Sequence, residues 1–269
     1  MARTADELFQ YFKEVQYVDR RVEIDGTRYY VVEADLLLNE DQLWDYAVKR
    51  AAREAADAAP VPVEEQGLVG IRNAQNQVVR WRPGKVLTYA IFQDSFLPAQ
   101  YPQVVAAMAQ ATGDWEAVCG VEFEHLAHLD VAGPGGSDET PLFWVRGVNT
   151  GQKLIAAAFF PDDPPSERRV IIDPIFFSPT LGFSREGVLR HELGHVLGFR
   201  HEHIRSGAPP DCKGENLDYI FELTPYDPTS VMHYLCGQKG DAALTITPVD
   251  RAGAMAVYGP PNSVFAFLD

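Results

Sequence analysis

The stretch HELGHVLGFRH at residues 191–201 decides the fold. Positions four residues apart lie on the same face of an α-helix, so His191 and His195 can present two imidazoles to one metal ion. Gly198 lies where the helix must end, because glycine adopts left-handed backbone angles without a Cβ clash. The chain can then turn back and offer His201 as a third ligand. Three protein ligands leave a fourth position for water, which is typical of a catalytic zinc site.

Glu192 follows the first histidine of this motif and is expected beside the metal. Zinc lowers the pKa of a bound water to about 7, and a nearby carboxylate can take the proton as the water attacks a carbonyl. Glu192 is therefore the predicted general base, and then the acid that protonates the leaving amine. A chance match on a surface helix is the alternative for H-E-x-x-H alone, and the extension to His201 argues against it.

The extended motif resembles that of the metzincin metallopeptidases. Within them, GFRHEH at 198–203 and YDPTSVMHY at 226–234 resemble the astacin family, and the likeness is diffuse over the rest of about residues 79–269. In astacins, the methionine makes a tight turn beneath the zinc, and the tyrosine two residues later is a reversible ligand that can stabilise the oxyanion. The resemblance carries these roles to Met232 and Tyr234. Core packing and a buried structural phenol are the respective alternatives.

The resemblance implies an α+β fold for the main part of the chain. We expect a mixed, mostly parallel twisted sheet with a zinc-binding helix below the cleft and a smaller C-terminal subdomain. A small α/β N-terminal segment is expected to precede it. The sequence PVPVEEQG at 60–67 is typical of an extended linker. We place an N-terminal segment, a candidate propeptide, at residues 1–72 and the catalytic domain at 73–269.

Residues 32–36, VEADL, resemble a short segment of astacin propeptides. That segment follows a Phe-x-Gly-Asp-like pattern, and its aspartate binds the zinc in place of water. Here valine and alanine stand where phenylalanine and glycine are usual. Asp35 is the candidate latency ligand, because a carboxylate oxygen can displace the nucleophilic water. An acidic residue that merely ends a strand is the alternative, with equal weight.

Hydrophobic periodicity and turn chemistry predict the remaining elements. Helices are expected at 5–17, from a cap at Asn39 toward 60, from 102 to 115, after a cap at Ser184, and from Thr247 to 258. Strands are expected at 21–24, 29–32, 85–91, 121–126, 142–148, 154–160 and 170–177. In metzincins the strand in the position of 154–160 forms the sheet edge, where an extended peptide can add. A buried strand is the alternative there.

Composition limits the class of partner. The 269 residues are 46% hydrophobic, which suffices for a packed core. A formal net charge of −15 argues against nucleic acid and anionic membranes, because both would repel the surface. No stretch approaches the roughly 20 apolar residues that span a bilayer, and residues 1–19 lack the apolar core of a signal peptide. A secreted or extracellular location is predicted, with a cytoplasmic location as the alternative.

Three cysteines cannot all pair within one chain. Cys212 and Cys236 flank the segment that leads from the third ligand past Met232, so we predict a disulfide between them, with free thiols as the alternative. Cys119 is expected to be a buried free cysteine. Astacins commonly bridge the matching cysteine to one near the C-terminus, and no cysteine follows Cys236 to reproduce that framework.

The leading hypothesis is a zinc-dependent endopeptidase with one catalytic zinc ion, made as a latent zymogen and acting on peptide or protein substrates. A non-catalytic zinc-binding interaction module is the main alternative. Glu192 argues against the module, since a structural zinc does not require that carboxylate. Hydrolysis of a small amide is a second alternative, which a closed pocket would favour. No oligomeric state is predicted.

Overall fold

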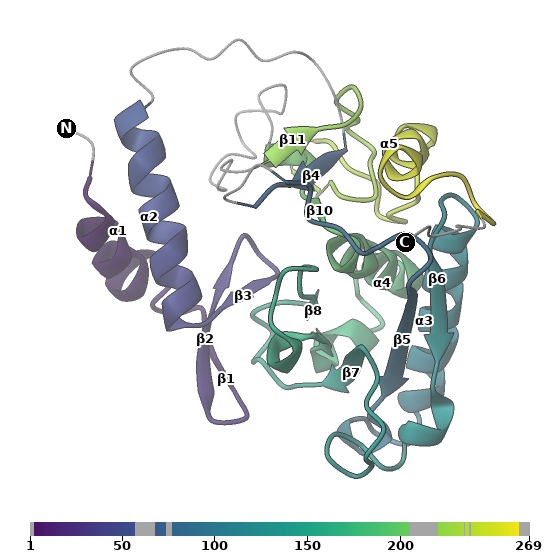
Figure 1. Ribbon diagram of the computed structural model, residues 1–269. Helices are drawn as coiled ribbons and strands as arrows, with labels where there is room; N and C mark the ends of the chain where they lie inside the picture. The colour runs from purple at the N-terminus through teal and green to yellow at the C-terminus, as the bar shows by residue number, and fades with distance from the viewer. Residues whose placement is uncertain are drawn as a thin grey trace.

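The computed structural model describes residues 3–56, 68–73, 77–204, 220–233, 235–236 and 238–263. We call residues 3–56 the N-terminal region, and the described residues from 68 onward the catalytic region. Figure 1 shows the N-terminal region against one side of the catalytic region, next to β8. Within the described ranges, no helix is long and apolar enough to cross a membrane.

The N-terminal region contains the predicted helices and hairpin. Helix α1 (Ala5–Tyr11) continues into a π-helical turn, and helix α2 (Glu40–Ala56) follows the predicted cap. Asn39 Oδ1 accepts the backbone N–H of Gln42, and Gln42 Oε1 accepts that of Asn39, both at 2.9 Å. This reciprocal pair satisfies two backbone donors at the start of α2.

A three-stranded antiparallel sheet completes this region. Strands β1 (Arg21–Ile24) and β2 (Thr27–Val32) form the predicted hairpin, and β3 (Leu36–Leu38) pairs with β2. The turn residues Asp25 and Gly26 both have positive φ angles, as tight hairpin turns require. The side chains of this sheet and of the two helices form a small core of their own.

The catalytic region is built on a five-stranded sheet in the order β6-β5-β7-β9-β8. Its strands are β5 (Val86–Ile91), β6 (Glu122–His125), β7 (Phe143–Gly147), β8 (Ala156–Ala157) and β9 (Arg169–Ile172). All neighbouring pairs are parallel except β8 with β9. The sheet is thus mixed and mostly parallel, as predicted, and β8 lies at one of its edges, the position that the resemblance to metzincins implies.

One predicted strand ends earlier than expected. The sequence favours a strand from 170 to 177, but β9 stops at Ile172 and a 3₁₀ helix spans Pro174–Phe177. Proline has no backbone N–H for a sheet, and Asp173 Oδ1 accepts the N–H of Ile175 at 2.9 Å instead. Hydrophobicity alone could not separate a strand from a 3₁₀ helix here, because an apolar run is compatible with either. Strand β8 is likewise shorter than the predicted 154–160.

Three helices surround the sheet, in the positions that the sequence predicts. They are α3 (Tyr101–Glu116), α4 (Arg185–Val196) and α5 (Pro248–Tyr258). Trp115 of α3 is fully buried and donates its indole N–H to the carbonyl of Arg190 at 2.8 Å. The Tyr258 hydroxyl donates to the carbonyl of Leu197 at 2.6 Å. These bonds fix α4 against its neighbours at both the middle and the end.

A second small sheet lies at the end of α4. Strand β4 (Val69–Ile71) lies between β10 (Phe199–Arg200) and β11 (Ile220–Glu222), antiparallel to both. Leu68 is buried in the main core. Residues 68–71 therefore belong structurally with the catalytic region, and the expected boundary after residue 72 lies beyond this strand. A three-residue strand beside a linker has too little periodicity to be read from sequence.

The N-terminal region covers the edge strand of the main sheet. An apolar cluster joins the two regions, with Val22, Ile24, Tyr29 and Val31 on one side and Leu154, Ala157 and Ile171 on the other. Arg146 binds Asp25 at 2.6 Å, and the Tyr29 hydroxyl donates to Glu167 at 2.9 Å. Ala157 of β8 lies in this cluster and is only 1% exposed, whereas its neighbour Ala156 is buried in the main core.

Candidate metal centre and active site

Local structure fixes the helix that carries the first two histidines. Ser184 caps α4, and its Oγ accepts the N–H of Gly187 at 2.9 Å. At the other end Gly198 has a φ of +90°, and its N–H donates to the carbonyl of His195 at 2.8 Å. A Cβ at Gly198 would lie 2.6 Å from the Val79 carbonyl oxygen. Glycine is therefore needed for the turn that brings β10 and His201 back to the helix.

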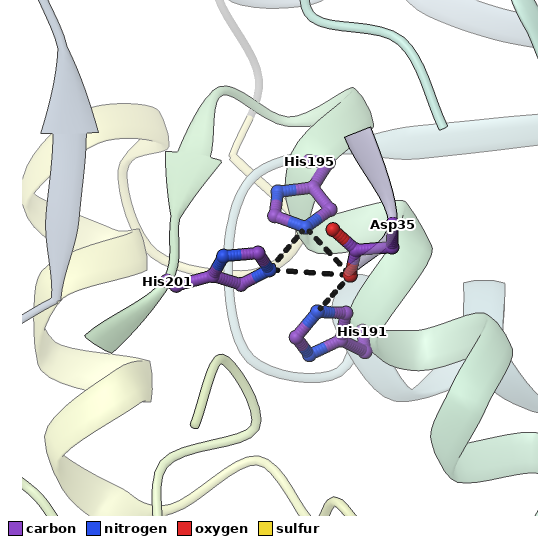
Figure 2. Close-up of side chains that lie close together, drawn as sticks. All are labelled: Asp35, His191, His195 and His201. Atoms are coloured by element: carbon purple, nitrogen blue, oxygen red, sulfur yellow. Dashed lines mark hydrogen bonds and ion pairs between the residues drawn. The ribbon is translucent and has the colours of Figure 1, made fainter. Parts of the chain in front are cut away.

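The three predicted histidines converge on Asp35 (Figure 2). Asp35 Oδ2 lies 3.2 Å from the Nε2 atoms of both His191 and His201, and 3.7 Å from that of His195. The Nε2 atoms of His195 and His201 are 3.1 Å apart. Tetrahedral zinc with bonds near 2.1 Å separates its ligands by about 3.4 Å. These four buried groups can therefore hold one metal ion.

The backbone orients two of the imidazoles. His191 Nδ1 lies 2.7 Å from the carbonyl oxygen of Val231, and His195 Nδ1 lies 2.7 Å from that of Phe199. A carbonyl can only accept, so each Nδ1 carries the proton and each Nε2 presents its lone pair to the metal. Burial lowers the pKa of His195 to about 4 despite the attraction of Asp35. This imidazole is thus neutral near pH 7, as metal binding requires.

Glu192 is buried beside this cluster, with 3% of its surface exposed. Its Oε2 atom has no hydrogen-bond partner among the residues that the structure describes. Burial and the nearby charge of Asp35 raise its pKa well above the usual range. A cavity of about 310 Å³ adjoins Glu192 and His191 and is lined mainly by apolar side chains, including Val188 and Leu244. A carboxyl group that can hold or release a proton therefore faces a cavity beside the metal ligands.

Comparisons with known proteins agree with this geometry. The low choriolytic enzyme of Oryzias latipes is 38% identical over 87 residues, which are 27% of this chain and 32% of that protein. Zinc metalloproteinase nas-3 of Caenorhabditis elegans is 31% identical over 115 residues, 38% of this chain and 37% of that protein. Tolloid of Drosophila melanogaster is 36% identical over 81 residues, 23% of this chain and 8% of that protein. No protein-family model matches the chain.

These relatives are astacin-family metalloproteinases. The chain is astacin-like. It spans about a third of the own length of the first two relatives, at 32% and 37%, and 8% of the third. A solved structure of myroilysin aligns with a TM-score of 0.50 at 16% identity, covering 73% of this chain and 100% of that one. At this identity the likeness supports the fold alone.

In the astacin-like chain, Asp35 is a buried carboxylate at the metal ligands. Burial opposes its ionisation, but the charge of His201 and the close approach of the three imidazoles outweigh burial, and the pKa of Asp35 lies well below the usual range. The aspartate reaches this position because β2 and β3 hold the segment between them against the catalytic region. A negatively charged oxygen therefore occupies the fourth corner of the cluster.

Met232 is fully buried beneath α4. A Cβ added to Gly194 would lie 2.3 Å from the Met232 sulfur, so the side chain fills the space that the glycine leaves. The Met232 carbonyl accepts the N–H of Glu202 at 2.8 Å. Asp250 holds the preceding residues, accepting from Ser230 Oγ at 2.5 Å and from Val231 N at 2.9 Å. The turn around Met232 thus supports both α4 and the segment after His201.

Two predicted residues, Tyr234 and Cys212, lie outside the described residues. Cys236 forms a disulfide, and Cys119 is a buried free cysteine, as predicted. The pairing of Cys236 with Cys212 stays a prediction. The role of Tyr234 at the oxyanion likewise stays a prediction.

Sequence reasoning missed a further contact between the two regions, next to the predicted metal ligands. Arg200, directly before His201, forms an ion pair with Glu33, two residues before Asp35. The Tyr46 hydroxyl donates to Glu33 Oε1 at 3.0 Å. Glu33 and Arg200 are 167 positions apart, so only the charge of Glu33 within an apolar run could have signalled a buried partner.

Proposed function

We propose that the astacin-like chain is a zinc-dependent endopeptidase made in a latent form, with Asp35 in the fourth ligand position. The observation that carries this proposal is the convergence of Asp35 Oδ2 on the Nε2 atoms of three histidines, at 3.2 to 3.7 Å. The buried carboxyl of Glu192 next to them supports catalysis rather than a purely structural metal.

The residues of the site divide the chemistry between them. His191, His195 and His201 would hold zinc, which supplies a Lewis acid for the scissile carbonyl and for a water molecule. Glu192 takes the proton of the attacking water and passes it to the leaving amine. Tyr234 is the proposed oxyanion stabiliser.

The edge strand β8 supports an extended peptide as substrate. An unpaired strand edge can add a peptide by main-chain hydrogen bonds, and the small side chains of Ala156 and Ala157 allow close approach. The N-terminal region covers this edge in the full chain. We therefore propose that latency has two components, a ligand on the metal and a cover over the substrate edge.

The proposed setting is outside the cytosol. Disulfides persist in oxidising compartments, and Cys236 is in a disulfide. The resemblance to astacins supports the same location.

The test compares peptide cleavage by the uncut chain and by a chain cut at a site-specific protease sequence placed within residues 60–67. The cut chain is expected to cleave peptides in a zinc-dependent way. Glu192→Gln should lower this rate by about 10² to 10⁴, because it removes the proton acceptor and keeps the shape. Glu186→Gln, an exposed glutamate on the same helix, is the matched control and should have little effect.

Zinc content and thermal unfolding are measured on the same samples. A cut chain that binds zinc and stays folded, yet cleaves nothing, would support the non-catalytic module. Cleavage that survives Glu192→Gln unchanged would remove Glu192 from the mechanism. Equal activity before and after cutting would exclude latency.

A further inference from the structure

A second group of metal-binding side chains lies close to His201. His203, His233 and Cys236 each place one nitrogen or sulfur atom within 4.8 Å of the other two. The two imidazoles are buried, and Cys236 is half-buried. Cys236 forms a disulfide in this structure, so its sulfur is not available to a metal in the oxidised chain. None of the three residues is a ligand of the catalytic centre described above.

Packing contacts hold the two imidazoles of this group close together. The rings of His203 and His233 meet at an angle of 61°, with their centres 5.5 Å apart. The His203 ring also stacks on that of His201, with centres 5.1 Å apart. The Tyr226 hydroxyl oxygen lies 2.8 Å from His233 Nε2. When this oxygen accepts the Nε2 proton, Nδ1 keeps a lone pair for a metal, which is how outer partners commonly orient metal-bound histidines.

The three ligand atoms lie near the spacing of a zinc site. Zinc bonds are about 2.1 Å to nitrogen and about 2.3 Å to sulfur, so a tetrahedral ion separates its ligands by roughly 3.5 Å. Atoms within 4.8 Å of one another need to approach by little more than about 1 Å. Reduction releases the Cys236 sulfur, whose side chain can then rotate toward the imidazoles. Thiolate and imidazole ligands suit zinc, whereas magnesium and calcium take oxygen ligands.

We propose that His203, His233 and Cys236 form a second zinc site, which binds the ion only when the disulfide of Cys236 is reduced. A thiol reductant gives two electrons and two protons to the bridge by thiol–disulfide exchange, and becomes a disulfide itself. Zinc then replaces the proton of the Cys236 thiol, which passes to solvent, and water or a second thiolate completes the tetrahedron. This site is separate from the proposed peptidase chemistry and does not depend on it.

Zinc at this site would hold together two segments that already meet. Glu202 directly precedes His203 and donates its backbone N–H to the carbonyl of Met232, which directly precedes His233. An ion bound to both histidines would stabilise this contact in a reducing compartment, where disulfides do not persist. In an oxidising compartment the disulfide of Cys236 takes the place of the metal. The same cysteine thus serves the fold in both environments.

The first experiment counts zinc in the full chain with and without reduction. The reductant is a phosphine, because a dithiol would itself compete for zinc. Both samples are loaded with zinc, desalted and analysed by atomic emission, and reduction is expected to add about one ion per chain. Cobalt supplies an independent signature, since sulfur-to-metal charge-transfer absorption requires a thiolate and the catalytic ligands include no sulfur. An unchanged zinc content, or a reduced cobalt-loaded chain without this absorption, would overturn the proposal.

Variants then assign the additional ion to the histidines. His203→Gln and His233→Gln should each abolish the zinc gained on reduction, while the oxidised variants keep the zinc content of the parent. His128→Gln, at an exposed histidine, is the matched control and should retain the gain, as should Cys119→Ala, which removes the buried free cysteine. Thermal unfolding of the oxidised variants checks their folding, and the cobalt spectrum of the parent tests the site where a substitution prevents folding. A gain that survives both histidine substitutions would overturn the proposal, because thiols alone would then bind the ion.

Discussion

The two regions of the chain reach the same metal centre through different kinds of structure. The catalytic region presents His191 and His195 from a capped, regular helix, with each Nδ1 fixed by a backbone carbonyl. The N-terminal region presents Asp35 after two consecutive left-handed residues, Glu33 with a φ of 51° and Ala34 with a φ of 70°. Non-glycine residues adopt these angles at a cost of about 1 kcal/mol each. Local structure thus positions these histidines, whereas tertiary contacts hold Asp35 in place after a strained stretch of backbone.

The difference extends to how each region is stabilised. The N-terminal region has a core of its own, in which Leu8, Tyr30 and Leu43 are almost fully buried. It meets the catalytic region through the apolar cluster around Val31 and Ile171, through Phe160, which packs against the N-terminal core, and through directed polar contacts. A region built in this way can leave without dismantling the site that it covers.

Substitution of the blocking ligand should have the largest effect. Asp35→Ala in the uncut chain is expected to raise peptide cleavage by about 100-fold, because it removes a charged ligand from the fourth metal position. The rate should stay below that of the cut chain, since the contacts of Val22 and Ile24 still cover the edge strand. Initial rates of peptide hydrolysis at saturating zinc measure the effect.

The control for this experiment is Asp19→Ala, which removes an exposed aspartate from the same region. It should leave the uncut chain latent. An Asp35→Ala chain that binds zinc and stays folded, but is no more active than its parent, would contradict the role of Asp35 in latency.

Gly194→Ala should destabilise the catalytic region. The added methyl group would lie 2.3 Å from the buried Met232 sulfur, so we expect a loss of about 2 kcal/mol in unfolding free energy and weaker zinc binding. Gly113→Ala makes the same change in helix α3, where nothing lies within 4 Å, and should be neutral or stabilising. Denaturant unfolding compares the two. Equal effects would show that Met232 does not constrain the helix.

A pH effect is expected at the boundary between the regions. Partial burial raises the pKa of Asp163 from 3.8 to about 6, where the side chain accepts the N–H of Phe160 at 2.7 Å and faces Gln42 of α2 at 3.4 Å. The folded chain therefore holds this proton more tightly than the unfolded chain. Its contribution to stability is present below about pH 4 and is lost as the pH rises through 6, by up to about 2 kcal/mol.

Asp163→Asn should flatten this part of the stability profile, because the amide oxygen can still accept the same bonds but does not titrate. Thermal unfolding between pH 4 and pH 7 checks this expectation, with the exposed Asp162→Asn as the control. An unchanged slope in Asp163→Asn would assign the pH dependence to another group.

Ala34→Gly should have the smallest effect, which is on the affinity between the two regions. Glycine relieves the left-handed strain at this position, so the N-terminal fragment of the cut chain should bind up to about fivefold more tightly. Release of the N-terminal fragment is measured as the gain of peptidase activity when the cut chain is diluted. Ala47→Gly, in the buried interior of α2, should act in the opposite direction by weakening the helix. Looser binding in Ala34→Gly would show that strain does not limit the latent state.

The sequence predicted the parts of the molecule that local chemistry decides. Ser184 and Thr247 cap their helices as expected, and Gly198 makes the turn after α4. The spacing of His191, His195 and His201 was sufficient to bring their Nε2 atoms together. Each of these features depends on residues within about ten positions of one another, so it is visible in a short stretch.

Features that depend on distant partners were not predictable in the same way. The ion pair of Glu33 with Arg200 and the pairing of β4 with β10 and β11 join segments far apart in the chain. The end of β9 at Ile172 depends on whether Asp173 continues the strand or caps a 3₁₀ helix, and the apolar residues that follow are compatible with either. Asp35 was recognisable only as a resemblance, because a lone aspartate at the end of a strand has no local signature of metal binding.

The position of Asp35 in the chain has a consequence for synthesis. It precedes His191 by 156 residues and His201 by 166, so the ribosome completes the blocking residue long before any metal ligand. The N-terminal region, with its own core, can fold while the rest of the chain is still being made. The nascent protein therefore never passes through a stage at which a complete metal site exists and its blocker does not. Under the proposed latency, the order of translation itself would protect the cell that makes this chain.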